Sequence, residues 1–139
     1  MTLPITEVVA GTPYYVLMDG SCRIGPDITP LHSGIECLPI YGFSDKGFYD
    51  NFCLRTPQAL TPYPLVKGYL RNQLGAPNNC LKLVVIDSAG PREPYLHAAT
   101  MKAVLEAQEN RTTHVTADYR LMFEEEANAY RVEEDCLKC

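Results

Sequence analysis

The chain has 139 residues, of which 46% are hydrophobic and 21% are charged, and its formal net charge at pH 7 is −5. This length suits one folded domain, and these proportions exclude disordered, collagen-like and coiled-coil proteins. The longest run of aliphatic residues covers only residues 83–86, which is far too short to cross a bilayer. We therefore predict a single globular domain over residues 1–139 with no membrane partner.

The basic residues of the middle third are spread along the chain. They are Lys46, Arg55, Lys67, Arg71 and Lys82. Binding to nucleic acid needs a concentrated basic surface that displaces counterions from phosphates, so we predict no nucleic-acid partner. The N-terminal residues have no basic flank followed by a long apolar stretch, and the expectation is a cytoplasmic protein.

The first third of the chain alternates β-type runs with turn formers. Residues 14–18 (YYVLM) lie between a proline and Asp19-Gly20, a pattern typical of a strand. Residues 19–36 are rich in glycine and proline and predict a long loop, with a short strand at 35–38. Residues 38–43 (LPIYGF) predict a further strand.

Two helices are predicted in the middle of the chain. Residues 44–54 form the first, with Ser44 as its N-cap and with Phe48 and Phe52 on one face. Residues 61–75 form the second, in which Thr61 is the cap, the following proline occupies the first turn and Gly75 provides a left-handed stop. Leu65, Tyr69 and either Val66 or Leu70 are expected to face the core.

The second half of the chain predicts a strand at about residues 81–87, because its apolar run suits a strand covered on both faces. A helix at 95–110 and a strand at 113–117 follow. Residues 118–135 fit a helix or a hairpin around 126–129, and their glutamate and alanine content favours the helix. The predicted fold class is α+β: a small mixed sheet with this central strand, packed by about three helices.

The chain closes on the pair Cys136 and Cys139, in a tail (residues 134–139) expected to be flexible. The spacing suits zinc, but a closed zinc site needs four ligands and no second such pair exists. The acidic residues before the pair disfavour a thiolate, which argues against a catalytic dithiol. No cofactor is predicted; zinc binding or a slow response to oxidation at this pair is the alternative.

A polar turn follows the predicted central strand and leads to a predicted helix. The carboxyl end of a central strand and the start of a helix are common ligand positions in α/β sheets. The side chains there that could contact a ligand are Asp87, Ser88, Arg92 and His97.

The sequence contains no phosphate-binding glycine loop and no nucleophile signature. The leading interpretation is a non-enzymatic cytoplasmic protein-interaction or regulatory domain that self-associates through its aromatic middle. One alternative is a thiol-redox or zinc-responsive module at Cys136 and Cys139. A second is a small enzyme with its site between Asp87 and His97.

Overall fold

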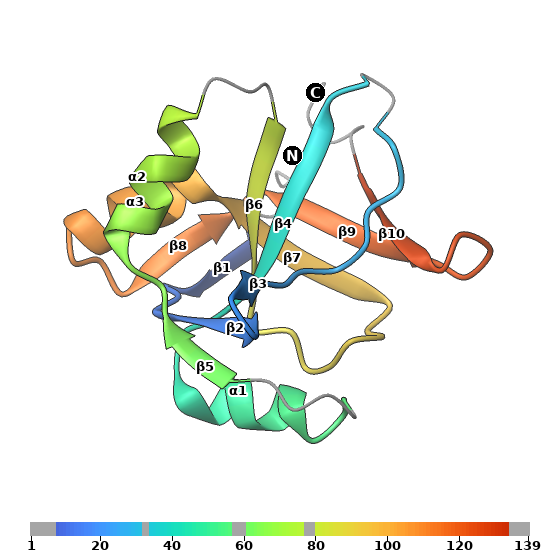
Figure 1. Cartoon of the computed structure of the whole chain (residues 1–139), viewed down its shortest axis with the longest axis horizontal. Helices are drawn as coiled ribbons and strands as arrows, with labels where there is room; N and C mark the ends of the chain where they lie inside the picture. Colours follow the sequence, from blue (N-terminus) through green and yellow to red (C-terminus); the bar gives the residue numbers. More distant parts are fainter. Residues whose placement is uncertain (1–7, 32–33, 57–60, 77–79, 134–139) are drawn as a thin grey trace, which may run out of the picture.

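The computed structural model describes residues 8–31, 34–56, 61–76 and 80–133, and it confirms the α+β fold class (Figure 1). The described residues form ten strands and three helices. The strands are β1 (Val8–Gly11), β2 (Tyr15–Asp19), β3 (Cys22–Arg23), β4 (Glu36–Phe43), β5 (Thr61–Pro64), β6 (Cys80–Ile86), β7 (Tyr95–Thr100), β8 (His114–Ala117), β9 (Tyr119–Glu124) and β10 (Ala129–Val132). The helices are α1 (Lys46–Cys53), α2 (Lys67–Gly75) and α3 (Met101–Glu109).

The main sheet is eight-stranded and mixed. Its order is β10-β9-β7-β6-β4-β2-β3, and β5 pairs with β2. Only β4 and β6 run parallel to each other among these described strands; the other neighbours are antiparallel. β1 and β8 form a separate antiparallel pair. The mixed sheet was predicted, and the predicted strands at 14–18, 38–43, 81–87 and 113–117 correspond to β2, β4, β6 and β8.

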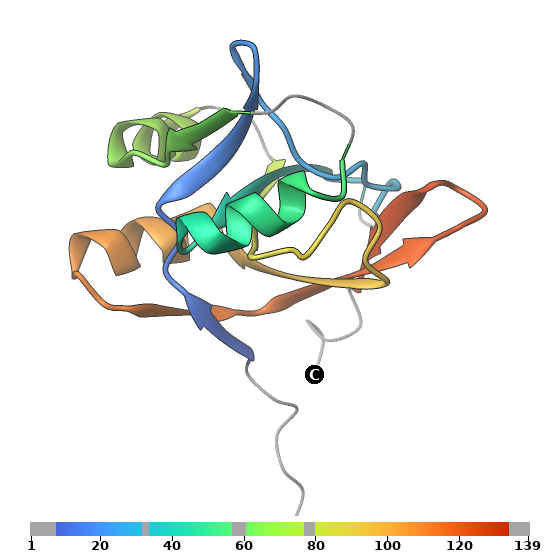
Figure 2. The same cartoon turned by 90° about the horizontal axis from the view of Figure 1, so that it is seen from below.

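β6 lies at the centre of the core, as its sequence predicts. Leu83 and Val85 belong to one buried cluster, and Val84 and Ile86 belong to the other, because side chains alternate across a strand. Helices α2 and α3 pack on the second cluster, whereas α1 packs on the first (Figures 1 and 2). No helix in the described ranges is long and apolar enough to span a bilayer.

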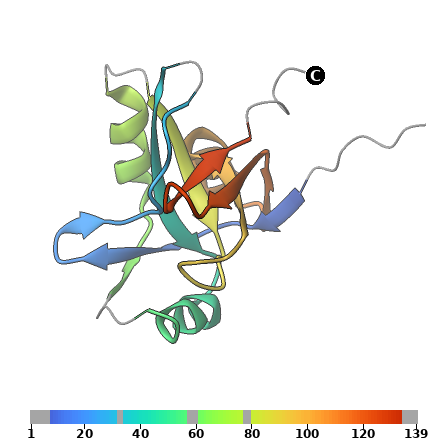
Figure 3. The same ribbon diagram turned by 90° about the vertical axis from the view of Figure 1, so that its right-hand side faces the viewer.

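Residues 24–29 of the predicted long loop link two distant parts of the sheet. The Ile24 carbonyl accepts a hydrogen bond from the Tyr41 N–H of β4 at 2.9 Å. Further along, the Asp27 carbonyl accepts one from the Tyr130 N–H of β10 at 2.8 Å. This segment therefore links the C-terminal hairpin to β4, and Figure 3 shows the path of the chain on this side.

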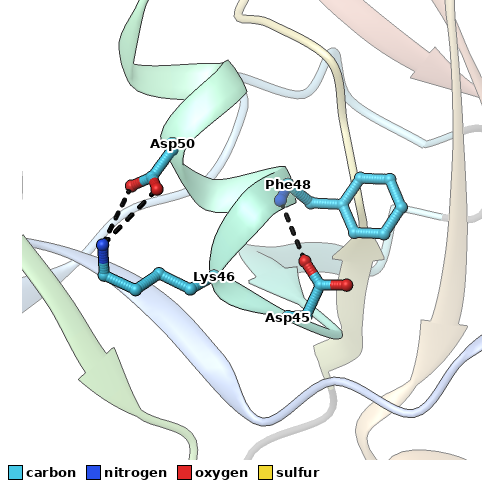
Figure 4. Close-up of polar contacts among 4 residues, drawn as sticks. All are labelled: Asp45, Lys46, Phe48 and Asp50. Atoms are coloured by element: carbon cyan, nitrogen blue, oxygen red, sulfur yellow. Dashed lines mark hydrogen bonds and ion pairs between the residues drawn. The ribbon is translucent and has the colours of Figure 1, made fainter.

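Helix α1 confirms the helix predicted at 44–54, but its cap and its buried face differ from the prediction. The Asp45 carboxylate accepts from the Phe48 N–H at 3.1 Å, and the Lys46 ammonium lies 3.4 Å from Asp50 (Figure 4). With the cap at Asp45, Tyr49 and Phe52 are buried three residues apart, while Phe48 is 43% exposed.

The helix predicted at 61–75 is wrong over its first part, which is strand β5. Residues before a proline avoid the helical region, and Pro62 and Pro64 restrict Thr61 and Tyr63 in this way. Helix α2 begins only at Lys67, without a side-chain cap. It ends at Gly75 as predicted, although Gly75 is not among the glycines with positive φ.

The two prolines also protect the edge of the sheet. Leu65 N–H donates to the Tyr14 carbonyl at 2.8 Å, so the alternate residues Pro62 and Pro64 face away from β2. Proline has no N–H to offer to another strand, so this edge cannot template regular pairing with a second chain.

The helix predicted at 95–110 is correct only from Met101 onward. Its first part is β7, in which Leu96 and Ala98 are buried beside β9, and Thr100 caps α3 by accepting from the Ala103 N–H at 3.1 Å. The helix favoured at 118–135 is also wrong. β9 and β10 form the hairpin that was its alternative, with Asn128 in the left-handed region at φ 52°.

Candidate functional site

A hollow of about 550 Å³ opens where four parts of the chain meet. They are residues 24–27, the end of α1, the turn 90–93 and the β9–β10 hairpin, with Tyr41 of β4 below them. A volume of this order suits a small organic molecule. A smaller hollow of about 340 Å³ is lined by residues 28–31 and 34–37.

The floor of the larger hollow is aromatic: three of its rings are buried, and the Phe123 ring is half-buried. The Tyr41 and Phe52 rings lie 4.8 Å apart, and the Phe123 and Tyr130 rings lie 5.1 Å apart. The Tyr130 hydroxyl donates to the Glu93 carbonyl at 2.5 Å, which ties the hairpin to the turn 90–93. These rings provide apolar contact area that a ligand can cover.

Tyr41 provides a polar group in this floor. Its side chain is only 5% exposed, and it lines the hollow. Burial, the nearby Tyr130 and the nearby Asp27 raise the pKa of Tyr41, so the hydroxyl stays protonated as a donor. A protonated hydroxyl that lines the hollow can donate a hydrogen bond to a bound molecule.

Two arginines at the rim of the hollow are held loosely. Arg55 lies 3.5 Å from the Glu93 carboxylate, and Arg92 lies 3.4 Å from the Asn128 side-chain oxygen. The Arg92 guanidinium is also 5.6 Å above the centre of the Phe123 ring. Both polar distances are longer than those of strong charge-assisted hydrogen bonds.

The opposite face of the same hairpin carries tightly paired arginines. Arg120 contacts the Glu133 carboxylate at 2.6 and 2.8 Å, and Arg131 contacts Glu124 at 2.8 Å. The first pair lowers the pKa of Glu133. Arg120 and Arg131 therefore have close charged partners. Arg55 and Arg92, at the rim of the hollow, have only long polar contacts.

Two glycines shape the walls. A Cβ atom at Gly25 would lie 2.1 Å from the Pro39 carbonyl oxygen, so only glycine lets this segment approach β4. A Cβ at Gly90 would lie 2.9 Å from Cδ of Arg55, so the bare backbone there leaves room for the arginine stem.

The predicted site residues Asp87 and Ser88 have local bonding roles. The Asp87 carboxylate accepts from the Ser44 N–H and from the Ser44 hydroxyl, each at 2.7 Å, and burial raises the pKa of Asp87. Ser88 is buried and its hydroxyl donates to the Gly90 carbonyl at 2.7 Å. Asp87 thus joins β6 to the start of α1, and Ser88 fixes the turn that lines the hollow.

The other two predicted residues lie on different sides of the sheet. Arg92 lines the hollow. His97 pairs in register with Arg120 on the tightly paired side of the sheet, and burial together with Arg120 lowers its pKa. The structure therefore brings one of the four predicted side chains, Arg92, to the rim of the hollow.

Sequence reasoning missed Tyr41, Arg55, Asn128 and Tyr130. They come from separate elements, and their meeting depends on hydrogen bonds between residues 24–29 and the strands on either side. The only local signal was the rigid Gly-Pro-Arg turn that places Arg92.

The Cys136 and Cys139 pair lies outside the described residues. Cys22, Cys37, Cys53 and Cys80 are free thiols. Burial and the neighbouring Cys80 raise the pKa of Cys37 to about 12, which makes it a poor nucleophile. Within the described ranges, no three His, Cys, Asp or Glu side chains gather in a way that could hold a metal ion.

Comparison of the chain with protein-family models, with curated proteins and with solved structures finds no match in any of the three. A functional proposal must therefore come from the geometry of the hollow and from its chemistry.

Proposed function

We propose that this chain is a non-enzymatic regulatory domain that binds a small amphipathic molecule in the hollow. The observation that carries the proposal is the hollow itself, in which aromatic rings lie beside the Tyr41 hydroxyl and two arginines. Ligand sites in proteins combine apolar walls with a few placed polar groups, and this hollow has both.

The lining side chains are suited to binding and orienting a molecule. Tyr41, Phe52, Phe123 and Tyr130 supply ring surface, and Arg92 supplies directional donors at the rim. A molecule with one ring and one polar end matches this arrangement. Such a molecule would contact both the hairpin and the turn 90–93. The Tyr130 hydroxyl already joins these two segments by a hydrogen bond.

A cytoplasmic location belongs to this proposal. Its support is that the four described cysteines carry free thiols, which is the usual state in a reducing compartment. The thiol or zinc alternative at Cys136 and Cys139 stays a prediction. So does the small enzyme with its site between Asp87 and His97.

A titration followed by amide NMR tests the binding role. We expect benzyl alcohol and phenylacetate to shift the amides of residues 24–27, 52–56, 90–93 and 128–130. Tyr41→Phe removes the hydroxyl alone and should weaken the binding of both probes by roughly threefold to tenfold. Tyr14→Phe is the matched control, because Tyr14 is exposed and does not line the hollow. Shifts confined to other residues, or no shifts at all, would contradict the proposal.

Self-association is a second candidate role, favoured by exposed apolar side chains in the middle of the chain. Leu54 is 84% exposed at the end of α1, and Phe48 and Tyr63 are also exposed. We expect sedimentation velocity to show a concentration-dependent dimer that Leu54→Glu weakens. A chain that stays monomeric at every concentration would contradict this role.

A further inference from the structure

The two rim arginines indicate which class of molecule the hollow binds. We infer that the ligand is an organic anion, in which a carboxylate or phosphate group binds Arg92 and Arg55 and a ring covers the aromatic floor. This inference rests on the proposed binding function and specifies the ligand class.

Arg92 is the stronger part of the argument. In the described part of the chain, no carboxylate pairs with it, and its one polar contact is the neutral Asn128 oxygen at 3.4 Å. A guanidinium presents a planar fork of N–H donors that matches carboxylate and phosphate oxygens. Most of that fork is therefore available to a bound anion.

The Phe123 ring holds this guanidinium at the rim. The 5.6 Å distance to the ring centre is within the range of a cation–π contact, which uses the face of the guanidinium rather than its N–H groups. Phe123 in turn packs against Tyr130, which is buried in the floor. The ring surface and the cation are thus supported by the same pair of strands.

Arg55 approaches from the opposite wall. Its stem passes over Gly90, and its guanidinium is 3.5 Å from Glu93, a distance that leaves the ion pair weak. Three other arginines are paired closely, and one of these pairs is exposed: Arg71 lies 2.8 Å from Glu109. Exposure to solvent therefore does not by itself make an arginine ion pair long.

The acids of the lining set the strength of this attraction. Asp27 and Glu93 balance the two arginines, so the lining has no formal net charge. Selection for an anion must then come from directed hydrogen bonds at short range. Such bonds are less sensitive to salt than attraction between distant charges, so we expect added salt to weaken binding only modestly.

Four probes with the same benzyl body separate the ligand classes: phenylacetate, benzyl phosphate, benzyl alcohol and benzylamine. In isothermal titration calorimetry we expect at least one of the two anions to bind about tenfold more tightly than benzyl alcohol. The better of the two identifies the anionic group. Arg92→Ala should remove this advantage, so that the variant binds neither anion more tightly than it binds benzyl alcohol.

Two further variants sharpen the test. Arg92→Lys keeps the positive charge but loses the planar fork, so it should lose most of the preference for the anions. Arg131→Ala removes a paired arginine from the opposite face of the same hairpin and should change no affinity. Circular dichroism and thermal melting of each variant establish that it is folded.

The outcomes distinguish the inference from the proposed function. Equal affinity for benzyl alcohol and both anions would overturn the anion inference and leave a binding pocket. Tightest binding of benzylamine would overturn it as well, and would identify the lining acids as the groups that bind the ligand. If none of the four probes binds, both the proposed function and this inference fail.

Discussion

The two faces of the β9–β10 hairpin use arginine in opposite ways. On one face, Arg120 and Arg131 contact glutamates at 2.6–2.8 Å. On the other face, Phe123 lies beneath Arg92, whose one polar contact is at 3.4 Å. Because side chains alternate along a strand, a single hairpin separates these two environments. An arginine with a close charged partner stabilises the hairpin, whereas a loosely held one is available to bind another molecule.

The largest expected effect is on the face toward the hollow. Tyr130 is buried in the core and anchors the floor, so Tyr130→Ala should lower the free energy of unfolding by about 3–5 kcal/mol. Its neighbour Arg131 points to the paired face, where Arg131→Ala should cost less than about 1 kcal/mol. Urea denaturation of both variants checks this difference, and equal losses would contradict the assignment of the two faces.

The close contact between Gly25 and β4 can be tested by adding one carbon atom at Gly25. Gly25→Ala would place Cβ 2.1 Å from the Pro39 carbonyl oxygen, and we expect it to lower the free energy of unfolding by about 1–3 kcal/mol. Gly68→Ala is the matched control, because a Cβ there meets no atom within 4 Å and alanine favours helix α2 by up to about 1 kcal/mol. Opposite signs for the two variants in thermal melting would support the close approach at Gly25, and a neutral Gly25→Ala would contradict it.

The smallest effect concerns acid pH on the paired face. Arg120 lowers the pKa of Glu133 below its ordinary value of 4.5, so the folded state binds that proton less readily than the unfolded state does. The stability contributed by this pair is complete above about pH 4.5 and is lost as the pH falls through the lowered pKa. Since Arg120 is 48% exposed, the loss should be about 1 kcal/mol or less.

Glu133→Gln provides the comparison for this pH dependence. Urea unfolding between pH 6 and pH 3 should show a shallower decline for the variant than for the unmodified chain. Parallel declines would mean that the Arg120–Glu133 pair contributes nothing to the stability of the fold.

The parts of the fold that could be predicted from sequence are those with a strong local pattern. β6 could be identified because its apolar residues suit burial on both faces. The C-terminal hairpin could not, because glutamate and alanine favour a helix locally, and the packing of Leu121 and Tyr130 against the sheet outweighs that preference. β5 was mistaken for the start of a helix because one proline suits a first turn, whereas two alternating prolines favour extended backbone.

The candidate site was harder to predict than the fold. Arg92 could be singled out because it lies in a turn beyond the central strand. Tyr41 and Phe52 look like ordinary core residues in the sequence, and they line one hollow with Arg92 because segments far apart in the chain meet in the fold. No spacing along the chain contains that information.

The most direct test follows the arginine side chains themselves. In an NMR titration with phenylacetate, we expect the Nε–H signals of Arg55 and Arg92 to shift in proportion to binding. The signals of Arg120 and Arg131 should not move, because their glutamate partners hold them on the opposite face. Shifts at Arg120 and Arg131 without shifts at Arg55 and Arg92 would contradict the assignment of the hollow as the binding site.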